Sequence, residues 1–288
     1  MSKLVPHEEN LTARYAERAA RMVPSEIRSL FAVASRPEIV SLAGGMPNLS
    51  ALPMEMMADV VKKLILDNGQ EALQYGSGQG HPRLREQICE MMALEGIRAK
   101  SDDVVITTGS QAALDLITRI FIDPGDVILV EAPSYVGALG VFAQYQSQVV
   151  HVAIDDKGLI PAALTEAITK VRAAGGKIKF LYCIPNFQNP SGVTMPASRR
   201  TEILDICRES EIFVVEDNPY GLLGFDETVP NAMRAEDHEN VIYLGSFSKT
   251  IVPGLRVGWA LVPQGVKEKL IIANESSVLC PSNFAQLT

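Results

Sequence analysis

A lysine, two serines and an arginine lie close together near the C-terminus, in the stretch SFSKTIVPGLR. Ser246, Ser248 and Lys249 follow the apolar run VIYLG, and Arg256 comes shortly after the lysine. Hydroxyls are neutral hydrogen-bond donors and a guanidinium is a charged two-pronged donor, so this set could bind a phosphate dianion. Lys249 could be a reactive amine, although a single lysine is usually a solvated surface residue.

An aromatic ring, an amide and an acid follow three other apolar runs. Tyr135 comes after VILVEAP, Asn189 after IKFLYCIP, and Asp217 and Tyr220 after IFVVE. Tyr135 either stacks on a planar ligand or packs at the start of a helix. Asn189 precedes Pro190 and is a candidate for a cis peptide bond. A carboxylate at the end of a buried strand is costly unless it is paired or exposed, so Asp217 either partners a buried cation or is a helix cap or solvated loop acid.

The motif TTGSQAAL offers a further binding position. Gly109, Ser110 and Gln111 enter an expected helix, whose N-terminus presents free backbone N–H groups and the positive end of the dipole. These features suit a phosphate cradle. For this motif taken alone, we favour the other interpretation, in which Ser110 only caps the helix.

The elements that carry these residues alternate between strands and helices from residue 103 onward. Helical patterns separate short β-rich runs at 103–108, 127–133, 148–154, 178–185, 212–217, 241–246 and 256–262. Strands that are apolar on both faces predict a doubly wound α/β fold, with a mostly parallel seven-stranded sheet and helices on both faces. Ligands of such sheets bind outside the carboxyl ends of the strands, where all these candidates lie.

One ligand matches the whole set of side chains. Phosphate donors, a stacking ring, an amide, an acid and a lysine at successive strand ends fit pyridoxal 5′-phosphate (PLP). This cofactor forms a Schiff base with a lysine, pairs its pyridinium nitrogen with an acid and is anchored by its phosphate. The sequence therefore predicts a PLP enzyme.

The composition argues against several other classes of binding partner. The 288 residues carry a formal charge of −8 and no basic run, which argues against nucleic acid and anionic membranes. The four histidines and four cysteines lack the spacing of metal ligands, so we expect no metal site and free thiols. The charged first residues contain no apolar signal segment and no stretch could span a membrane, so we expect a cytoplasmic protein.

Seven ordered motifs resemble those of the fold-type I PLP-dependent aminotransferases of class I/II. They are VSLAGGMPN, LQYGSGQGHPRLRE, TTGSQAALDL, EAPSYVGAL, PNFQNPSG, VVEDNPY and GSFSKTIVPGLRVGW. Within that group the chain looks most like the 2-aminoadipate/kynurenine branch. The resemblance runs from about residue 24 to the C-terminus. It implies transfer of an amino group from an L-amino acid to a 2-oxo acid by a homodimer with shared active sites.

The resemblance also implies a role for each matching residue. Lys249 would form the Schiff base and move the substrate proton, and Asp217 would pair with the pyridinium nitrogen. Tyr220 and Asn189 would bind the phenolic oxygen of the cofactor, and Tyr135 would stack on its ring. Gly45 and Asn189 would also line the substrate pocket. The phosphate would be held by Ser110, Gln111, Ser246, Ser248 and Arg256, and by Tyr75 of the neighbouring subunit.

Family members continue beyond the end of this chain into a small C-terminal domain. We therefore expect residues 1–50 to form an N-terminal arm and small-domain segment, and residues 51–288 an incomplete PLP-binding large domain. The family's arginine for the substrate carboxylate has no counterpart here, and Arg28 or Arg36 could only be secondary. We expect the truncated chain to keep the cofactor pocket and to transaminate poorly or not at all.

Three other functions compete with transamination. A PLP-dependent β-lyase would use the same lysine and acid, because a fold does not fix its chemistry. A non-catalytic aminotransferase-like domain of a DNA-binding regulator would need a longer N-terminal region than this acidic chain has. The segment GSGQG does not follow a strand and lacks the full dinucleotide-binding pattern, which argues against a nicotinamide dehydrogenase. The sequence does not choose among 2-aminoadipate, kynurenine, aromatic and branched-chain substrates.

Overall fold

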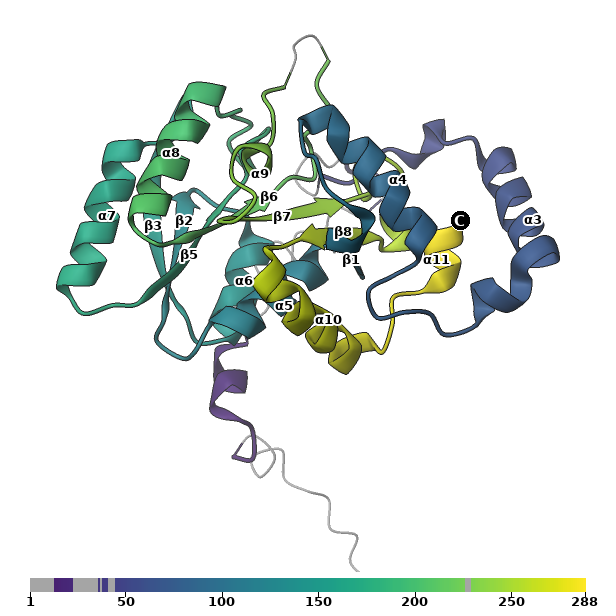
Figure 1. Ribbon diagram of the computed structural model, residues 1–288, viewed down its shortest axis with the longest axis horizontal. Coiled ribbons are helices and arrows are strands. Elements are labelled where there is room, and N and C mark those ends of the chain that lie inside the picture. Colours follow the sequence, from purple (N-terminus) through teal and green to yellow (C-terminus); the bar gives the residue numbers. More distant parts are fainter. Residues whose placement is uncertain (1–12, 23–35, 37, 41–44, 226–228) are drawn as a thin grey trace, which may run out of the picture.

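The computed structural model describes residues 13–22, 36, 38–40, 45–225 and 229–288. An eight-stranded sheet in the order β1-β8-β7-β6-β5-β2-β3-β4 forms the centre (Figure 1). All seven predicted strands are present, and the two-residue β4 extends one edge. The strands are β1 (Val104–Thr107), β2 (Val127–Ala132), β3 (Gln148–Asp155), β4 (Gly158–Leu159), β5 (Ile178–Cys183), β6 (Phe213–Asp217), β7 (Val241–Ser246) and β8 (Gly258–Leu261).

Five neighbouring strands run in the same direction. β3, β2, β5, β6 and β7 pair in parallel, whereas β8 is antiparallel to both β7 and β1, and β4 is antiparallel to β3. The predicted mostly parallel sheet is therefore confirmed. Every residue of β7 and all but one of β6 are buried, because both faces of the sheet are covered. The parallel order brings the carboxyl ends of β2, β5, β6 and β7 to one edge.

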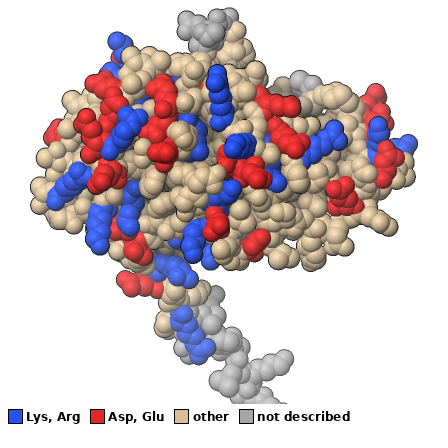
Figure 2. All heavy atoms as spheres, viewed as in Figure 1, with Lys and Arg blue, Asp and Glu red and all other residues tan. Residues whose placement is uncertain are grey.

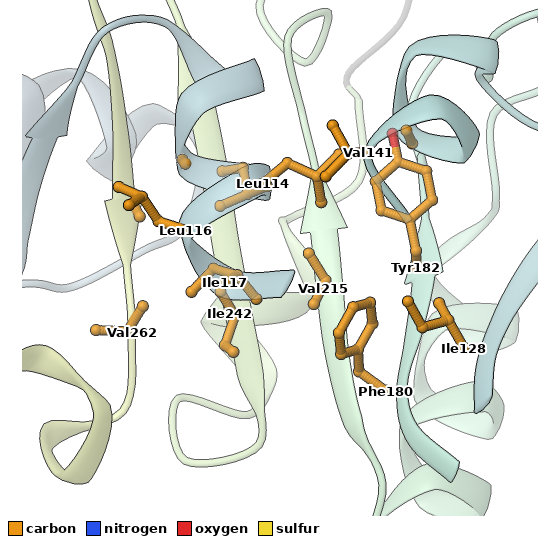
Figure 3. Packing of buried hydrophobic residues seen from close by; sticks show 14 of the residues in the cluster. Leu114, Leu116, Ile117, Ile128, Val141, Phe180, Tyr182, Val215, Ile242 and Val262 are labelled. Atoms are coloured by element: carbon orange, nitrogen blue, oxygen red, sulfur yellow. The ribbon is translucent and has the colours of Figure 1, made fainter. Parts of the chain in front are cut away.

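Helices cover both faces of the sheet, as predicted (Figure 1). Apolar side chains of α5 (Ser110–Phe121), α6 (Val136–Gln144) and α10 (Gln264–Val278) pack on one face. Figure 3 shows this layer, in which Leu114 and Ile117 of α5 lie over Val215 and Ile242 of the sheet. The opposite face is covered by α7 (Pro161–Ala173) and α8 (Ala197–Glu209).

A third apolar cluster lies under α4 (Pro82–Met92). Ile88 and Met92 of this helix pack with Trp259 of β8 and Tyr243 of β7. The helix is followed by the 3₁₀ turn η3 (Ala93–Glu95), which carries Glu95 into the interior. The remaining short elements are α9 (Met233–Glu236) and the 3₁₀ turns η1 (Glu17–Arg21), η2 (Leu49–Ala51), η4 (Ser101–Asp103) and η5 (Pro253–Leu255).

The helix α3 (Met54–Leu73) lies at the far end of the molecule, beside α11 (Asn283–Leu287) (Figure 1). Asn283 donates from Nδ2 to the carbonyls of Glu71 and Gln74, each at 3.3 Å. Much of the apolar surface of α3 is uncovered: Met54, Met56, Leu66 and Leu73 are between 57% and 74% exposed. None of the helices in the described residues is long and apolar enough to cross a membrane.

The surface seen in Figure 2 mixes acidic and basic side chains, without a large area of one sign. All four cysteines are free thiols; Cys183 and Cys207 are buried, and Cys89 and Cys280 are half-buried. The division of the chain at residue 50 stays a prediction.

Candidate active site

The side chains that the sequence singles out meet at the carboxyl edge of the parallel strands. Asp217 is the last residue of β6 and Ser246 the last residue of β7. Asn189 lies in the loop after β5, and Tyr135 lies immediately before α6 in the connection from β2. Because these four strands are neighbours in the sheet, their ends form one continuous surface.

Asp217 is 6% exposed, and its two carboxylate oxygens differ in their hydrogen bonding. The hydroxyl of Tyr182 donates to its Oδ2 at 2.7 Å, while its Oδ1 is buried without a hydrogen-bond partner in the described part of the chain. Burial raises the pKa of Asp217 to about 6, and the Tyr182 hydrogen bond opposes that rise. The interpretation of this residue as a helix cap or solvated loop acid is wrong. A buried acceptor of this kind requires a donor, preferably a cationic one.

Two phenols and an amide surround the position in front of Asp217. Nδ2 of Asn189 lies 3.5 Å from the hydroxyl of Tyr220, across the ends of two strands. Burial raises the pKa of Tyr135, and the negative charge of Asp217 raises it further, while Arg256 opposes both. Tyr135 therefore lies within electrostatic reach of both Asp217 and Arg256.

The hydroxyls of Ser246 and Ser248 form one corner of the site with Arg256. The Ser246 hydroxyl donates to Oγ of Ser248 at 2.9 Å and accepts from the Ser248 backbone N–H at 3.1 Å. Nη1 of Arg256 donates to Oγ of Ser248 at 3.3 Å. Arg256 has a left-handed backbone (φ +54°), which is costly for a residue with a side chain. The set holds three donors that a phosphate could share.

Glycines bring the start of α5 into this corner. Gly258 of β8 pairs with Thr107 on one side and Ser246 on the other, and a Cβ at Gly258 would collide with the backbone nitrogen of Ser110. Gly109, with φ +79°, leaves room for Nη2 of Arg256 in the same way. The close backbone approach therefore places the N-terminus of α5 beside the serines and the arginine.

The helix α5 begins at Ser110, with Gly109 as its N-cap and no side-chain capping bond. The favoured interpretation of Ser110 as a capping residue is therefore wrong. The first N–H groups of a helix have no acceptors within it, so Ser110 and Gln111 offer backbone donors toward an anion. The side chain of Gln111 is occupied: it donates to the carbonyl of Gly137 at 3.0 Å and accepts from the Tyr135 hydroxyl at 3.4 Å.

Lys249 contacts the N-terminal segment. Its Nζ donates to the carbonyl of Gly45 at 2.7 Å, and partial burial lowers the pKa of the amine. The structure thus brings together Gly45 and Lys249, which are separated by 204 positions in the chain. Part of the motif VSLAGGMPN lies outside the described residues, as does Arg28; Arg36 is exposed.

Tyr75 stands apart from this group. Its side chain is 76% exposed and makes no hydrogen bond to the other candidates within the described part of the chain. Its predicted role belongs to a neighbouring subunit, and it stays a prediction.

Several residues that the sequence did not single out support the site. Tyr182 donates to Asp217. Tyr182 of β5 pairs with Val215 of β6, and Asp217 lies two residues beyond Val215, so both side chains project from the same face of the sheet. The alternation of side chains along the two strands was the signal that could have identified Tyr182. Gln188 is 2% exposed and donates to Oε2 of Glu131 at 3.3 Å and to the carbonyl of Pro133 at 2.8 Å. Gln188 therefore ties the loop of Asn189 to the loop of Tyr135. No local pattern marked it.

The residues present fit PLP. The buried Oδ1 of Asp217 offers an acceptor for a protonated ring nitrogen, and the corner formed by Ser246, Ser248 and Arg256 offers donors for a phosphate. Lys249 supplies an amine of lowered pKa. The described residues contain no group of histidine, cysteine and acidic side chains that could hold a metal ion.

Comparison with known proteins identifies the family. Residues 38–288 match the family "Aminotransferase class I and II". The chain belongs to this family. It is 40% identical over 275 residues to aromatic-amino-acid aminotransferase 1 of Thermococcus litoralis, a match that covers 95% of this chain and 66% of that protein. The chain thus spans slightly less than two thirds of this relative's length.

Solved structures agree with this assignment. A kynurenine aminotransferase from Pyrococcus horikoshii, in complex with PMP, superposes with a TM-score of 0.90 at 38% identity, covering 96% of this chain and 69% of that one. An α-aminoadipate aminotransferase from Thermus thermophilus, complexed with N-(5′-phosphopyridoxyl)-L-leucine, gives a TM-score of 0.87 at 34% identity, covering 96% and 68%. The predicted aminotransferase fold is confirmed, and the relatives that the chain resembles include aromatic, kynurenine and aminoadipate aminotransferases.

Proposed function

We propose that this aminotransferase-family chain is a PLP-dependent transaminase that moves an amino group from an L-amino acid to a 2-oxo acid. The observation that carries the proposal is the buried Oδ1 of Asp217, which has no hydrogen-bond partner among the described residues and lies at the same strand edge as Lys249. An unsatisfied carboxylate oxygen in this place has a physical reason if a cationic ring nitrogen binds to it. Substrates of the 2-aminoadipate, aromatic or branched-chain type are supported by the relatives' names.

The cofactor would supply an electron sink for the substrate carbanion when it is bound through a Schiff base to Lys249. Asp217 would hold the proton of the ring nitrogen. Its carboxylate gains a cationic partner there, which lowers its pKa again. Tyr220 and Asn189 would orient the opposite edge of the ring by hydrogen bonds to its phenolic oxygen. Tyr135 would cover the ring face.

Lys249 would act as the base and acid that moves the substrate proton. Its lowered pKa increases the fraction of neutral amine near neutral pH, which a general base requires. Ser246, Ser248, Arg256 and the backbone of Ser110 and Gln111 would hold the phosphate. Arg256 provides the positive charge that the phosphate dianion needs, and the hydroxyls provide neutral donors.

We also propose a homodimer in which Tyr75 completes the neighbouring phosphate site. The support is the 76% exposure of Tyr75 next to the uncovered apolar side chains of α3. Uncovered apolar surface of this kind is expected at a subunit interface.

A visible absorbance spectrum tests the cofactor and its lysine together. PLP added to the purified chain should produce a band near that of a lysine Schiff base, and Lys249→Ala should abolish it. Lys269→Ala, at an exposed position of α10, is the matched control and should leave the band unchanged. A band of equal intensity in Lys249→Ala would contradict the proposal. Product analysis separates the chemistries, because a β-lyase releases ammonia instead of leaving the aminated cofactor.

A further inference from the structure

A buried chain of polar side chains lies behind the turn that carries Asp217 and Tyr220. It consists of Glu95, Tyr243, Asn218, Asn186 and Arg200, here called the Glu95 network. All five are at most 7% exposed, and Asn186 and Arg200 are at 0%. Buried polar groups are expensive unless they are fully paired, so their retention in the interior calls for a role.

The hydrogen bonds of the Glu95 network run in one direction. Nη2 of Arg200 donates to Oδ1 of Asn186 at 2.5 Å, and Nδ2 of Asn186 donates to Oδ1 of Asn218 at 2.9 Å. Nδ2 of Asn218 donates to Oε1 of Glu95 at 2.5 Å. The Tyr243 hydroxyl donates to the other Glu95 oxygen at 2.7 Å. A cation at one end and a carboxylate at the other thus fix the orientation of both amides.

The two asparagines lie in different strand-end loops. Asn186 belongs to the loop after β5, which also carries Asn189, and Asn218 directly follows Asp217 in the turn that leads to Tyr220. The bond between the asparagines therefore clamps one loop to the other. Gly221 closes the packing, because a Cβ there would collide with the carboxylate of Glu95 and the amide of Asn218.

The ends of the network are anchored in the fold. Arg200 of α8 also donates to the carbonyls of Met195 at 2.9 Å and Asn231 at 2.8 Å. The backbone carbonyl of Glu95 accepts from the N–H of Ala232 at 2.9 Å. The clamp is therefore attached to α8 through Arg200 and to η3 through Glu95, while its middle joins the loops that follow β5 and β6.

We infer that the Glu95 network is a positioning device that sets Asn189 and Tyr220 at the spacing needed to bind one oxygen of the cofactor together. The inference rests on the proposed function, since it concerns the same cofactor. Asn189 and Tyr220 approach each other at 3.5 Å, and the Asn186–Asn218 hydrogen bond of 2.9 Å links the two loops that carry them. Asn218 and Glu95 are thus positioning residues that act through Asp217 and Tyr220.

Reversal of one hydrogen bond tests this role. Asn218→Asp keeps the shape of the side chain but sets a carboxylate oxygen against Oε1 of Glu95. The double variant Glu95→Gln/Asn218→Asp restores a donor and an acceptor at that contact, with the direction exchanged and the net charge unchanged. Asn68→Asp, at an exposed position of α3, is the matched control for the amide-to-acid change.

The measurements are the PLP dissociation constant, the pH midpoint of the visible lysine–PLP band and the melting temperature. We expect Asn218→Asp to weaken PLP binding about tenfold and to shift the pH midpoint, as loss of a charge-assisted hydrogen bond would. The double variant should recover both values, and Asn68→Asp should leave both unchanged. The spectra are recorded well below the melting temperature of each variant.

Two results would overturn the inference. One is a folded Asn218→Asp protein with the wild-type affinity and pH midpoint, which would leave the network a purely structural role visible only in the melting temperature. The other is a double variant that is no better than Asn218→Asp in PLP binding, including one that fails to fold. A wild-type chain that takes up no PLP would instead reject the proposed function.

Discussion

The two charged side chains at the centre of the site both have their charged forms disfavoured by burial. Burial raises the pKa of Asp217 to about 6 and lowers the pKa of Lys249. Each would be relieved by the cofactor: the acid by a cationic ring nitrogen, and the amine by conversion to a Schiff base. Function therefore costs stability in the cofactor-free protein, which is a common compromise at active sites.

Asp217→Asn should stabilise the cofactor-free protein at alkaline pH. The carboxyl has a pKa of about 6 in the folded chain and its ordinary value of 3.8 in the unfolded chain. The free energy of unfolding is therefore highest below pH 4, where the carboxyl is protonated in both states, and it falls as pH rises through 6. The difference corresponds to about 3 kcal/mol at pH 8. The melting temperature of Asp217→Asn should exceed that of the wild type by several degrees at pH 8 and by little at pH 4.

Asp156→Asn, at an exposed position, is the control and should show no such pH-dependent gain. If the difference in melting temperature between Asp217→Asn and the wild type were the same at pH 4 and at pH 8, the assignment of a raised pKa to Asp217 would be contradicted. Titration with PLP should show the opposite order, because the variant lacks the carboxylate that holds the ring nitrogen.

At the scale of elements, the corner formed by Ser246, Ser248 and Arg256, here called the phosphate corner, depends on how closely α5 approaches β8. Gly258→Ala should disrupt it, since the added Cβ collides with the backbone nitrogen of Ser110 and cannot be relieved by a side-chain rotation. Overpacking of this kind costs about 1–3 kcal/mol. We expect a melting temperature lower by several degrees and a weaker affinity for PLP, measured by thermal denaturation and by titration of the visible band.

Gly140→Ala in α6 is the matched control, because a Cβ there meets no atom within 4 Å. A helical alanine is favoured over glycine by up to about 1 kcal/mol, so this variant should be as stable as the wild type or more stable. If Gly258→Ala behaved like Gly140→Ala in both measurements, the close approach of α5 would not define the phosphate corner.

The elements that carry the candidate site were predictable because their signals are local. Apolar strands separated by helices indicated the parallel sheet, and the residues after each strand were then expected at one edge. The resemblance added roles to these residues. The capping interpretation of Ser110 was wrong because the glycine before it takes the N-cap position, where a left-handed backbone lets Arg256 approach.

The supporting contacts were not predictable, because they join distant residues. Glu95 and Asn218 are 123 positions apart, and neither residue type marks a buried partner in a sequence. The same holds for Gln188 and Glu131, which are 57 positions apart. Only the packed arrangement of η3, β6, β5 and β2 reveals that these polar side chains pair. Sequence patterns thus locate the groups that touch a ligand more readily than the groups that hold them.

At the scale of the whole molecule, the helix α3 is only partly covered by the rest of the chain that the structure describes. Tyr75 follows that helix, and its side chain is 76% exposed. Met54, Met56, Leu66 and Leu73 add uncovered apolar surface to the same helix. Burial of such side chains is worth about 25 cal/mol per Å² of apolar area, so a second copy of the chain would gain free energy by covering them.

A shared-site dimer predicts complementation between two defective chains. Lys249→Ala and Tyr75→Phe homodimers should each have every site defective, the first without the lysine and the second with weakened phosphate binding. A mixed dimer holds one site with both defects and one site with neither. Co-refolding the two variants in equal amounts should therefore restore wild-type PLP affinity to about a quarter of all sites, as half of the dimers are mixed and each gains one intact site.

The visible band at a limiting PLP concentration measures that fraction, and sedimentation confirms the dimer. Because a site built within one chain cannot exchange residues, a band equal to the average of the two separate variants would contradict the shared site.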